Sequence, residues 1–178
     1  MSNYTKDELV TLVQENPEEF NSWKKEQEEV DLSEVDFSTM NFNEVDFSDV
    51  DLNSSSFSDC NLSLVNFSNT DLTSVDFTRA KIVECDFTGS ILTGADCSYA
   101  EMTYCNFSEA DLAGCVFSES ILSNSDFTSS YNLHACRFDD DTEWPDPELM
   151  PDDFDAVYKD DLSAMKDEED EFSSDGSY

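Results

Sequence analysis

The chain has 178 residues, of which 43 are Asp or Glu and eight are Lys or Arg, so its formal net charge at pH 7 is −35. This length fits one domain with a tail, and the charge excludes direct binding to a nucleic-acid backbone or to an anionic membrane, because both need Lys and Arg. No apolar run approaches the ~20 residues of a membrane span, and a signal-peptide core is missing, so we expect a cytoplasmic protein.

Residues 1–29 predict two helices. A capping box runs from Thr5 to Glu8, and apolar residues follow at helical spacing. A second helix is expected to begin at Asn16-Pro17, with Phe20 and Trp23 on one face.

From Leu32 to Phe127 a large inward-type residue stands at every fifth position, twenty positions in all. A period of five fits neither a helix nor a simple strand, so it indicates a repeat architecture. From Phe37 onward Phe recurs every ten residues, broken once at Cys97. If Phe stacks on Phe, a coil holds twenty residues, because ten could hardly close around the ring. Residue i then lies on residue i+20, about 4.8 Å away.

The units Val35-Asp36-Phe37-Ser38 and Val75-Asp76-Phe77-Thr78 resemble those of the pentapeptide-repeat proteins. The resemblance covers about residues 30–139 and implies an all-β solenoid, a right-handed quadrilateral β-helix, here of about five to six coils. The ends of a solenoid expose apolar surface and unpaired strand edges. We therefore expect residues 1–29 to form an amino-terminal helical cap; the alternative is a helix that binds a partner.

Five of the six cysteines fall on inward positions. Cys97 takes a large position, and the small positions two residues before a large one hold Cys60, Cys85, Cys105 and Cys115. We interpret them as reduced core residues, which is typical of a cytosolic protein. Their spacings match no zinc site, and we expect neither a metal nor a cofactor.

The repeat slips by one residue near residue 130. Asn132 stands where a large apolar residue is due, and Leu133 and Phe138 resume the pattern one position later. We expect a bulge with one inserted residue near Ser129-Ser130.

Residues 140–166 predict a carboxyl-terminal segment with a short helix that either caps the solenoid or links two chains in a homodimer. Its apolar residues are Trp144, Phe154, Val157, Tyr158, Leu162 and Met165. Residues 167–178 predict a disordered acidic tail.

The outward residues distinguish four faces, which we number 1 to 4 from their first residues Asp31, Asp36, Asn41 and Asp46. Faces 1 and 4 adjoin, and neither has a basic residue. Their acidic residues are Asp31, Asp51, Asp71 and Asp111 on face 1, and Asp46, Asp49, Asp86, Glu109 and Asp126 on face 4. Face 3 carries the least charge and presents Leu64, Val83, Tyr104 and Ile121.

Residues 30–129 contain eighteen acidic and two basic residues, a net charge of −16. Over five coils this is one negative charge per about 1.5 Å of axis, close to the roughly 1.7 Å of duplex DNA. On face 4 the charges alternate with Asn66 and Asn106.

Three functions remain open, and none of them is enzymatic. The lone histidine, His134, is interpreted as an exposed polar residue, and a filled solenoid core offers no obvious substrate pocket. The resemblance implies a DNA mimic, because some pentapeptide-repeat proteins bind DNA gyrase or topoisomerase IV by imitating duplex DNA. This chain differs from the quinolone-resistance members in lacking their projecting loops. A nuclease or restriction-type target fits the same hypothesis. The alternatives are a protein-interaction scaffold that uses face 3, and a solubilised rod whose charge has no specific partner.

Overall fold

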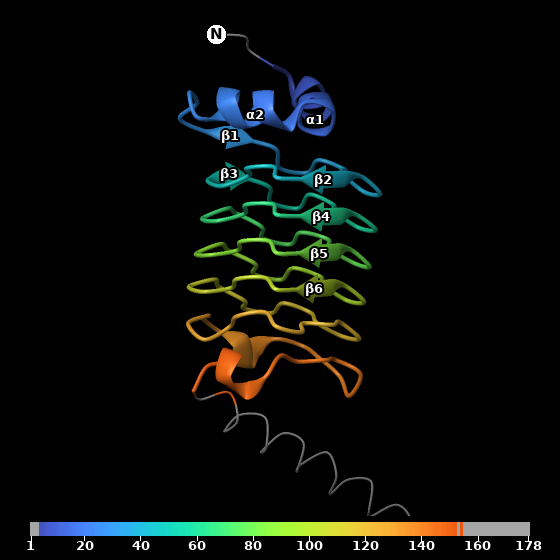
Figure 1. Cartoon of the computed structure of the whole chain (residues 1–178), viewed down its shortest axis with the longest axis vertical. Helices are drawn as coiled ribbons and strands as arrows, with labels where there is room; N and C mark the ends of the chain where they lie inside the picture. Colours follow the sequence, from blue (N-terminus) through green and yellow to red (C-terminus); the bar gives the residue numbers. More distant parts are fainter. Residues whose placement is uncertain (1–3, 153, 155–178) are drawn as a thin grey trace, which may run out of the picture.

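The computed structural model describes residues 4–152 and 154, which form a helical pair followed by a β-solenoid (Figure 1). Helix α1 (Lys6–Glu15) begins with the predicted capping box, in which Thr5 and Glu8 exchange hydrogen bonds. Helix α2 (Pro17–Lys24) begins after Asn16, whose side chain accepts a hydrogen bond from the Glu19 N–H. Both predicted helix starts are confirmed. None of the helices in the described part of the chain is long and apolar enough to cross a membrane.

Helix α2 lies on the first coil. The ring of Phe20 is completely buried and packs edge-on against Phe47, with 5.7 Å between the ring centroids. Trp23 packs beside Phe20 and against Tyr4. The apolar face predicted for this helix therefore packs against the first core phenylalanines.

The solenoid is held by parallel pairing at a constant separation of twenty residues. Asn41 lies opposite Asn61, then Lys81 and then Glu101, so the predicted coil length is confirmed. The strands are β1 (Val30–Asp31), β2 (Asn41–Asn43), β3 (Val50–Asp51), β4 (Asn61–Ser63), β5 (Lys81–Val83) and β6 (Glu101–Thr103). Strands β1 and β3 pair on face 1, and β2, β4, β5 and β6 pair on face 3. Isolated bridges continue the same register around all four faces.

The core is a stack of the large residues that the five-residue pattern predicted. All twenty positions from Leu32 to Phe127 are buried, at 3% exposure or less. On one side Phe67, Phe87, Phe107 and Phe127 stack nearly parallel, with successive centroids 5.1, 4.9 and 4.5 Å apart. Burial of this apolar surface is the main stabilising contribution that the sequence provides.

All six cysteines are free and buried, as expected for five of them. The Cys97 side chain interrupts a Phe column, and its sulfur lies 3.9 Å from that of Cys115. Burial raises the pKa of the Cys60 thiol to about 11 and that of Cys85 to about 12, so both thiols are neutral at physiological pH.

Each corner of the solenoid uses a residue in the left-handed region of backbone space. From Glu34 to Asn124 every fifth residue has a positive φ, and only Gly89, Gly94 and Gly114 among these are glycines. A left-handed conformation costs a residue with a Cβ roughly 1–2 kcal/mol. The corners are nevertheless retained because the corner N–H groups from Glu34 to Glu109 donate to carbonyl oxygens of the next coil, as Glu34 does to Asn53 (2.8 Å).

The register changes at the carboxyl-terminal end. Asp111 still pairs with Tyr131, but Val116 pairs with Arg137 and Ile121 with Glu143, so the separation grows from twenty to 21 and then 22 residues. The expected insertion at Ser129-Ser130 is therefore wrong in position.

The extra residue lies beyond Tyr131, where Asn132 adopts φ 60° and leads into the 3-10 helix η1 (Leu133–Ala135). A left-handed residue followed by a helical turn accommodates it in place of a strand bulge. The second insertion lies between Arg137 and Glu143, and it was missed because the repeats were expected to end at residue 139. Trp144, six residues after Phe138, marks it by packing on Phe117 and Phe127.

The last described residues fold back on the final coil. The Leu149 carbonyl, at the end of the 3-10 helix η2 (Pro147–Leu149), accepts a hydrogen bond from the Phe127 N–H (2.7 Å). Trp144 packs on Phe127 and Phe154, with centroids 6.1 and 5.1 Å away. Val157, Tyr158, Leu162 and Met165, and the predicted acidic tail, lie outside the described residues.

The corner conformation predicts that Thr39→Gly stabilises the protein. Thr39 is β-branched and has φ 63°, an unfavourable combination that glycine relieves. We expect the free energy of unfolding in urea to rise by about 0.5–1 kcal/mol after the entropic cost of glycine. The matched control is Thr78→Gly, at a position outside the left-handed corners, which should lower stability by about 0.5–1 kcal/mol. Equal losses in the two variants would contradict the strain argument.

Candidate functional site

Seven of the nine predicted acidic residues on faces 1 and 4 have a structural role. Each accepts, through one carboxylate oxygen, a hydrogen bond from the backbone N–H two residues later, over 2.9–3.1 Å. These residues are Asp31, Asp46, Asp51, Asp71, Asp86, Asp111 and Asp126. The bond shapes an Asx-turn before each corner and also fixes the direction of the carboxylate. The other two, Asp49 and Glu109, are exposed left-handed corner residues.

The column on face 4 shows that a neutral amide oxygen can take the place of the carboxylate in this turn. Asp46, Asn66, Asp86, Asn106 and Asp126 follow one another in the ladder. The side-chain oxygens of Asn66 and Asn106 accept the same bond, from the N–H groups of Ser68 and Ser108, both at 2.9 Å. Charged residues in this column are thus about 9.6 Å apart, two coil spacings, which reduces their repulsion.

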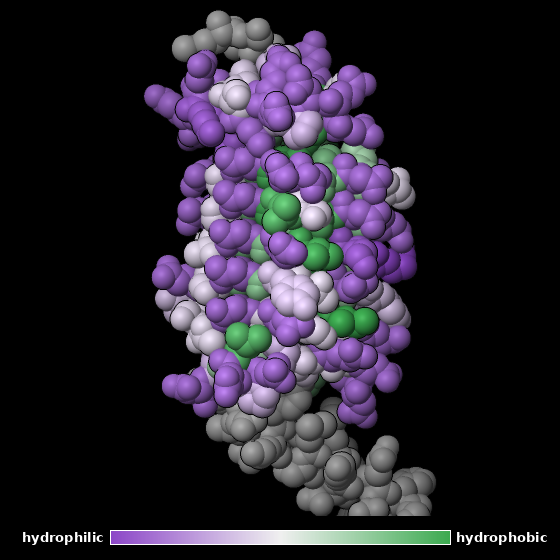
Figure 2. Space-filling view, in the orientation of Figure 1, coloured by the Kyte–Doolittle hydropathy of each residue, from purple (hydrophilic) through white to green (hydrophobic). Residues whose placement is uncertain are grey.

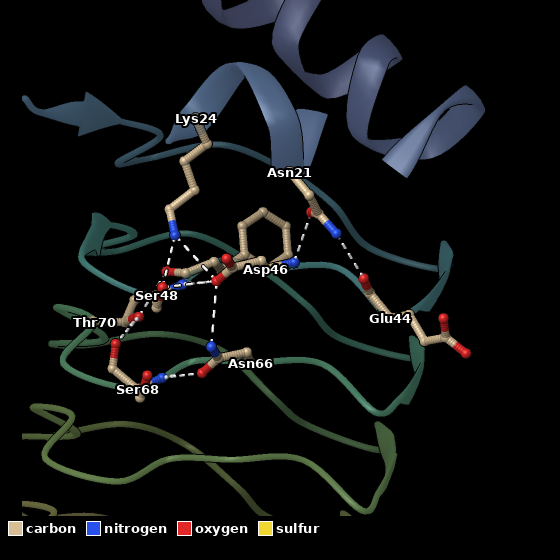
Figure 3. Close-up of polar contacts among 9 residues, drawn as sticks. Asn21, Lys24, Glu44, Asp46, Ser48, Asn66, Ser68 and Thr70 are labelled. Carbon is tan, nitrogen blue, oxygen red and sulfur yellow. Dashed lines mark hydrogen bonds and ion pairs between the residues drawn. The ribbon is translucent and has the colours of Figure 1, made fainter. Parts of the chain in front are cut away.

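The amino-terminal end of this column is neutralised by helix α2 (Figure 3). Lys24 is only 9% exposed, and its Nζ donates to Asp46 Oδ1 (3.0 Å) and to Ser48 Oγ (2.7 Å). Beside it, Asn21 Nδ2 donates to the Glu44 carbonyl oxygen and Asn21 Oδ1 accepts from the Asp46 N–H, both over 2.9 Å. The Asn21 amide therefore satisfies backbone groups that a preceding coil would otherwise pair.

Face 1 is neutralised at the same end by helix α1. Lys6 Nζ lies 2.7 Å from Asp31 Oδ1. Hydrogen bonds from Lys6 and Ser33 lower the pKa of Asp31 to about 2. Burial raises the pKa of Asp46, but the hydrogen bonds from Ser48 and Lys24 outweigh it, and the net pKa is lowered. Two of the nine predicted acidic residues are therefore ion-paired.

Beyond the first coil, the acidic residues of faces 1 and 4 have no basic partner among the residues that the structure describes. The other two salt bridges within the described residues join Arg79 to Asp59 and Lys81 to Glu101, on faces 2 and 3. We define the acidic surface as the unpaired residues of faces 1 and 4: Glu34, Asp49, Asp51, Asp71, Asp86, Glu109, Asp111 and Asp126. It is continuous around the corner that the two faces share, but Ile91 and Tyr131, which the sequence analysis overlooked, stand in its face 1 column, 44% and 58% exposed.

Face 3 presents the apolar residues predicted for it. Leu64, Tyr104 and Ile121 are 46%, 61% and 37% exposed, and Val83 is partly buried. Val83 lines a shallow depression of about 410 Å³, floored by Phe42 and Leu62. Hydrophobic residues gather in the region of β4 and β5, with hydrophilic residues on both sides (Figure 2). His134, interpreted from the sequence as an exposed polar residue, is exposed on η1.

The comparisons with known proteins agree with this architecture. Residues 26–97 match the family described as pentapeptide repeat region, and residues 105–140 match pentapeptide repeats (8 copies). The chain belongs to the pentapeptide repeat proteins. Such proteins are generally non-catalytic structural or interaction proteins. The comparison with curated proteins found no match.

Two solved structures illustrate the likeness. The pentapeptide repeat protein Rfr23 from the cyanobacterium Cyanothece 51142 is 20% identical, with a TM-score of 0.62 over 70% of this chain and 97% of that one. A trypsin-treated variant of QnrB1, a plasmid-mediated fluoroquinolone resistance protein, is 20% identical, with a TM-score of 0.51 over 76% and 84%. At these identities they show the shared fold, a right-handed quadrilateral β-helix.

The buried ion pair predicts that Lys24→Met destabilises the protein. The substitution leaves the half-buried Asp46 carboxylate without its cation, and we expect a loss of about 2 kcal/mol in the free energy of unfolding. Lys6→Met is the control, because Lys6 is 41% exposed and its loss should cost less than about 1 kcal/mol. Adding Asp46→Asn to Lys24→Met should restore part of the stability. No recovery in this double variant would contradict an electrostatic role for Lys24.

The lowered pKa of Asp31 predicts a specific titration. In the folded protein the carboxyl should titrate near pH 2, so its pairing stabilises the fold above the unfolded pKa of about 3.9 and loses that effect as the pH falls toward 2. An NMR titration of the side-chain carboxyl should show the pKa rising in Lys6→Met toward the ordinary value. An unchanged pKa in that variant would exclude Lys6 as the main cause.

Proposed function

We propose that this chain is a non-catalytic DNA mimic whose acidic surface occupies the basic DNA-binding groove of a DNA-processing protein. The observation that carries the proposal is the set of eight unpaired carboxylates on faces 1 and 4. Over the five coils, about 24 Å, they supply one negative charge per about 3 Å, close to the roughly 3.4 Å between phosphates along one DNA strand.

The backbone hydrogen bonds strengthen this proposal. Five of the eight carboxylates accept a hydrogen bond from a backbone N–H, and the other three, those of Glu34, Asp49 and Glu109, stand on corners fixed by the ladder. A surface whose charges are already ordered loses little side-chain entropy when it binds. The complementary partner has a basic groove, and long-range attraction should make its association fast and sensitive to salt.

The proposed partner is a gyrase or other topoisomerase, a nuclease or a restriction-type enzyme, which the chain either inhibits or protects. Family members that mimic DNA, and the resistance function of QnrB1, favour the first of these. We place this activity in the cytoplasm, because six free cysteines favour a reducing compartment. The helical pair would close the amino-terminal end of five to six coils, and residues 140–166 would close the other end or link two chains.

The test is capture of partners from a bacterial lysate on the immobilised full chain, with elution by duplex DNA. We expect a DNA-processing protein that duplex DNA displaces and that binds more weakly as salt is raised. The variant carrying Asp71→Asn, Asp86→Asn and Asp126→Asn should lose at least about tenfold in affinity for the purified partner. Asn preserves the turns, as Asn66 and Asn106 show.

The matched control carries Asp76→Asn and Asp96→Asn on face 2. Both residues accept the same backbone bond, so the control removes charge from a different face without changing the turn. Its affinity should stay within about threefold of the original, since these charges lie outside the proposed interface. A partner that duplex DNA does not displace, or an equal loss in both variants, would refute the mimic.

A further inference from the structure

Four successive corner residues on face 3 alternate charge and apolar surface, and Asn124 follows them in the same row. The left-handed corners Glu44, Leu64, Glu84 and Tyr104 lie one above another, because each coil is paired with the next at a separation of twenty residues. All four are exposed. We call this set the face 3 ridge.

The other three rows of corners differ from this ridge. On face 2 the charges are paired within the row, Arg79 with Asp59, and Glu119 accepts a hydrogen bond from Tyr99. The rows on faces 1 and 4 hold small or polar residues, among them Ser54, Ser74, Asn69 and three glycines. Within the described residues, the face 3 ridge is the row in which exposed apolar side chains alternate with unpaired acidic ones.

The ridge borders the apolar depression on the same face. The row Asn43, Ser63 and Val83 precedes the corner residues directly and forms one side of the depression, whose floor is Phe42 and Leu62. Lys81 on the far side is engaged by Glu101 at 3.0 Å, so within the described part of the chain Glu44 and Glu84 have no cation. A partner on this face would bury apolar surface and would have to supply positive charge.

The spacing of the ridge selects the conformation of such a partner. Successive ridge residues are about 4.8 Å apart, so like residues recur at about 9.6 Å. In a helix that lies parallel to the solenoid axis, residues seven positions apart point in the same direction and are about 10.5 Å apart along the axis. A residue half a heptad along lies on the same side, at about 5.3 Å. An extended strand repeats one face every ~6.8 Å and soon loses register with the ridge.

We propose that face 3 binds an amphipathic helix of a partner protein, aligned with the solenoid axis. This helix presents a basic and an apolar residue alternately at every half heptad. Its basic residues pair with Glu44 and Glu84, and its apolar residues pack on Leu64 and Tyr104 and into the depression beside Val83. The interface is independent of the acidic surface.

The test uses two synthetic helical peptides of the same composition and the full chain. In the first, Arg and Leu alternate at half-heptad steps along one face; in the second, the same residues are grouped as Arg-Arg and Leu-Leu. Binding is measured by fluorescence anisotropy at about 150 mM salt, because salt at this concentration limits the nonspecific attraction of the basic peptides to the highly acidic protein. We expect the alternating peptide to bind at least about tenfold more tightly than the grouped one.

Variants locate the binding face. Leu64→Ser with Tyr104→Ser should abolish the preference for the alternating peptide, and Glu84→Gln should reduce it. Ser stands at the equivalent corners 54 and 74, so the fold tolerates it. The controls Ile91→Ser on face 1 and Glu109→Gln on face 4 match Leu64 and Glu84 in exposure or corner position and should leave the preference unchanged.

Two results would overturn the inference. One is that both peptides bind equally tightly; the other is that the control variants reduce the preference as much as the face 3 variants do. The triple Asp→Asn variant of the acidic surface should retain the preference. A failure of the DNA-mimic proposal would therefore leave this result unchanged, and the two proposals fail separately.

Discussion

The whole structure depends on the hydrogen-bonded ladder that pairs each residue with the one twenty positions later. It stacks the phenylalanines, and it holds the corner residues in a left-handed conformation that most of them would avoid in isolation. Because every coil is bound to its neighbours by the same set of bonds, local strain at one corner is outweighed by the cooperative contacts around it.

The same ladder turns a structural requirement into a charged surface. Many five-residue units place a side-chain oxygen ahead of their corner, and Asp, Asn or Ser can supply it, as Asp46, Asn66 and Ser56 illustrate. The choice of Asp at most of these places on faces 1 and 4 is therefore a choice of charge and not of fold. Selection for a basic partner can act on that choice without altering the backbone.

The sequence predicted the coil length, the buried positions and both helix starts, because Phe37 and its successors repeat with a strict period and Thr5 to Glu8 form a recognisable cap. It did not predict the left-handed corners, since residues such as Leu64 and Tyr104 have no intrinsic preference for them. The pairing of Lys24 with Asp46 was also missed, because a cation 22 residues away becomes a partner only when the helix packs on the coil. The second insertion was missed because the repeats were expected to end at residue 139, before Trp144 continues the core.

The alternation of Asp and Asn along face 4 also has an evolutionary consequence. Deleting or duplicating one coil of twenty residues would place two aspartates, or two asparagines, side by side in that column and disturb the charge spacing. Deleting or duplicating two coils would restore it. The electrostatic repeat of this column is thus forty residues although the structural repeat of the solenoid is twenty, and related chains that keep the column should differ in length by even numbers of coils.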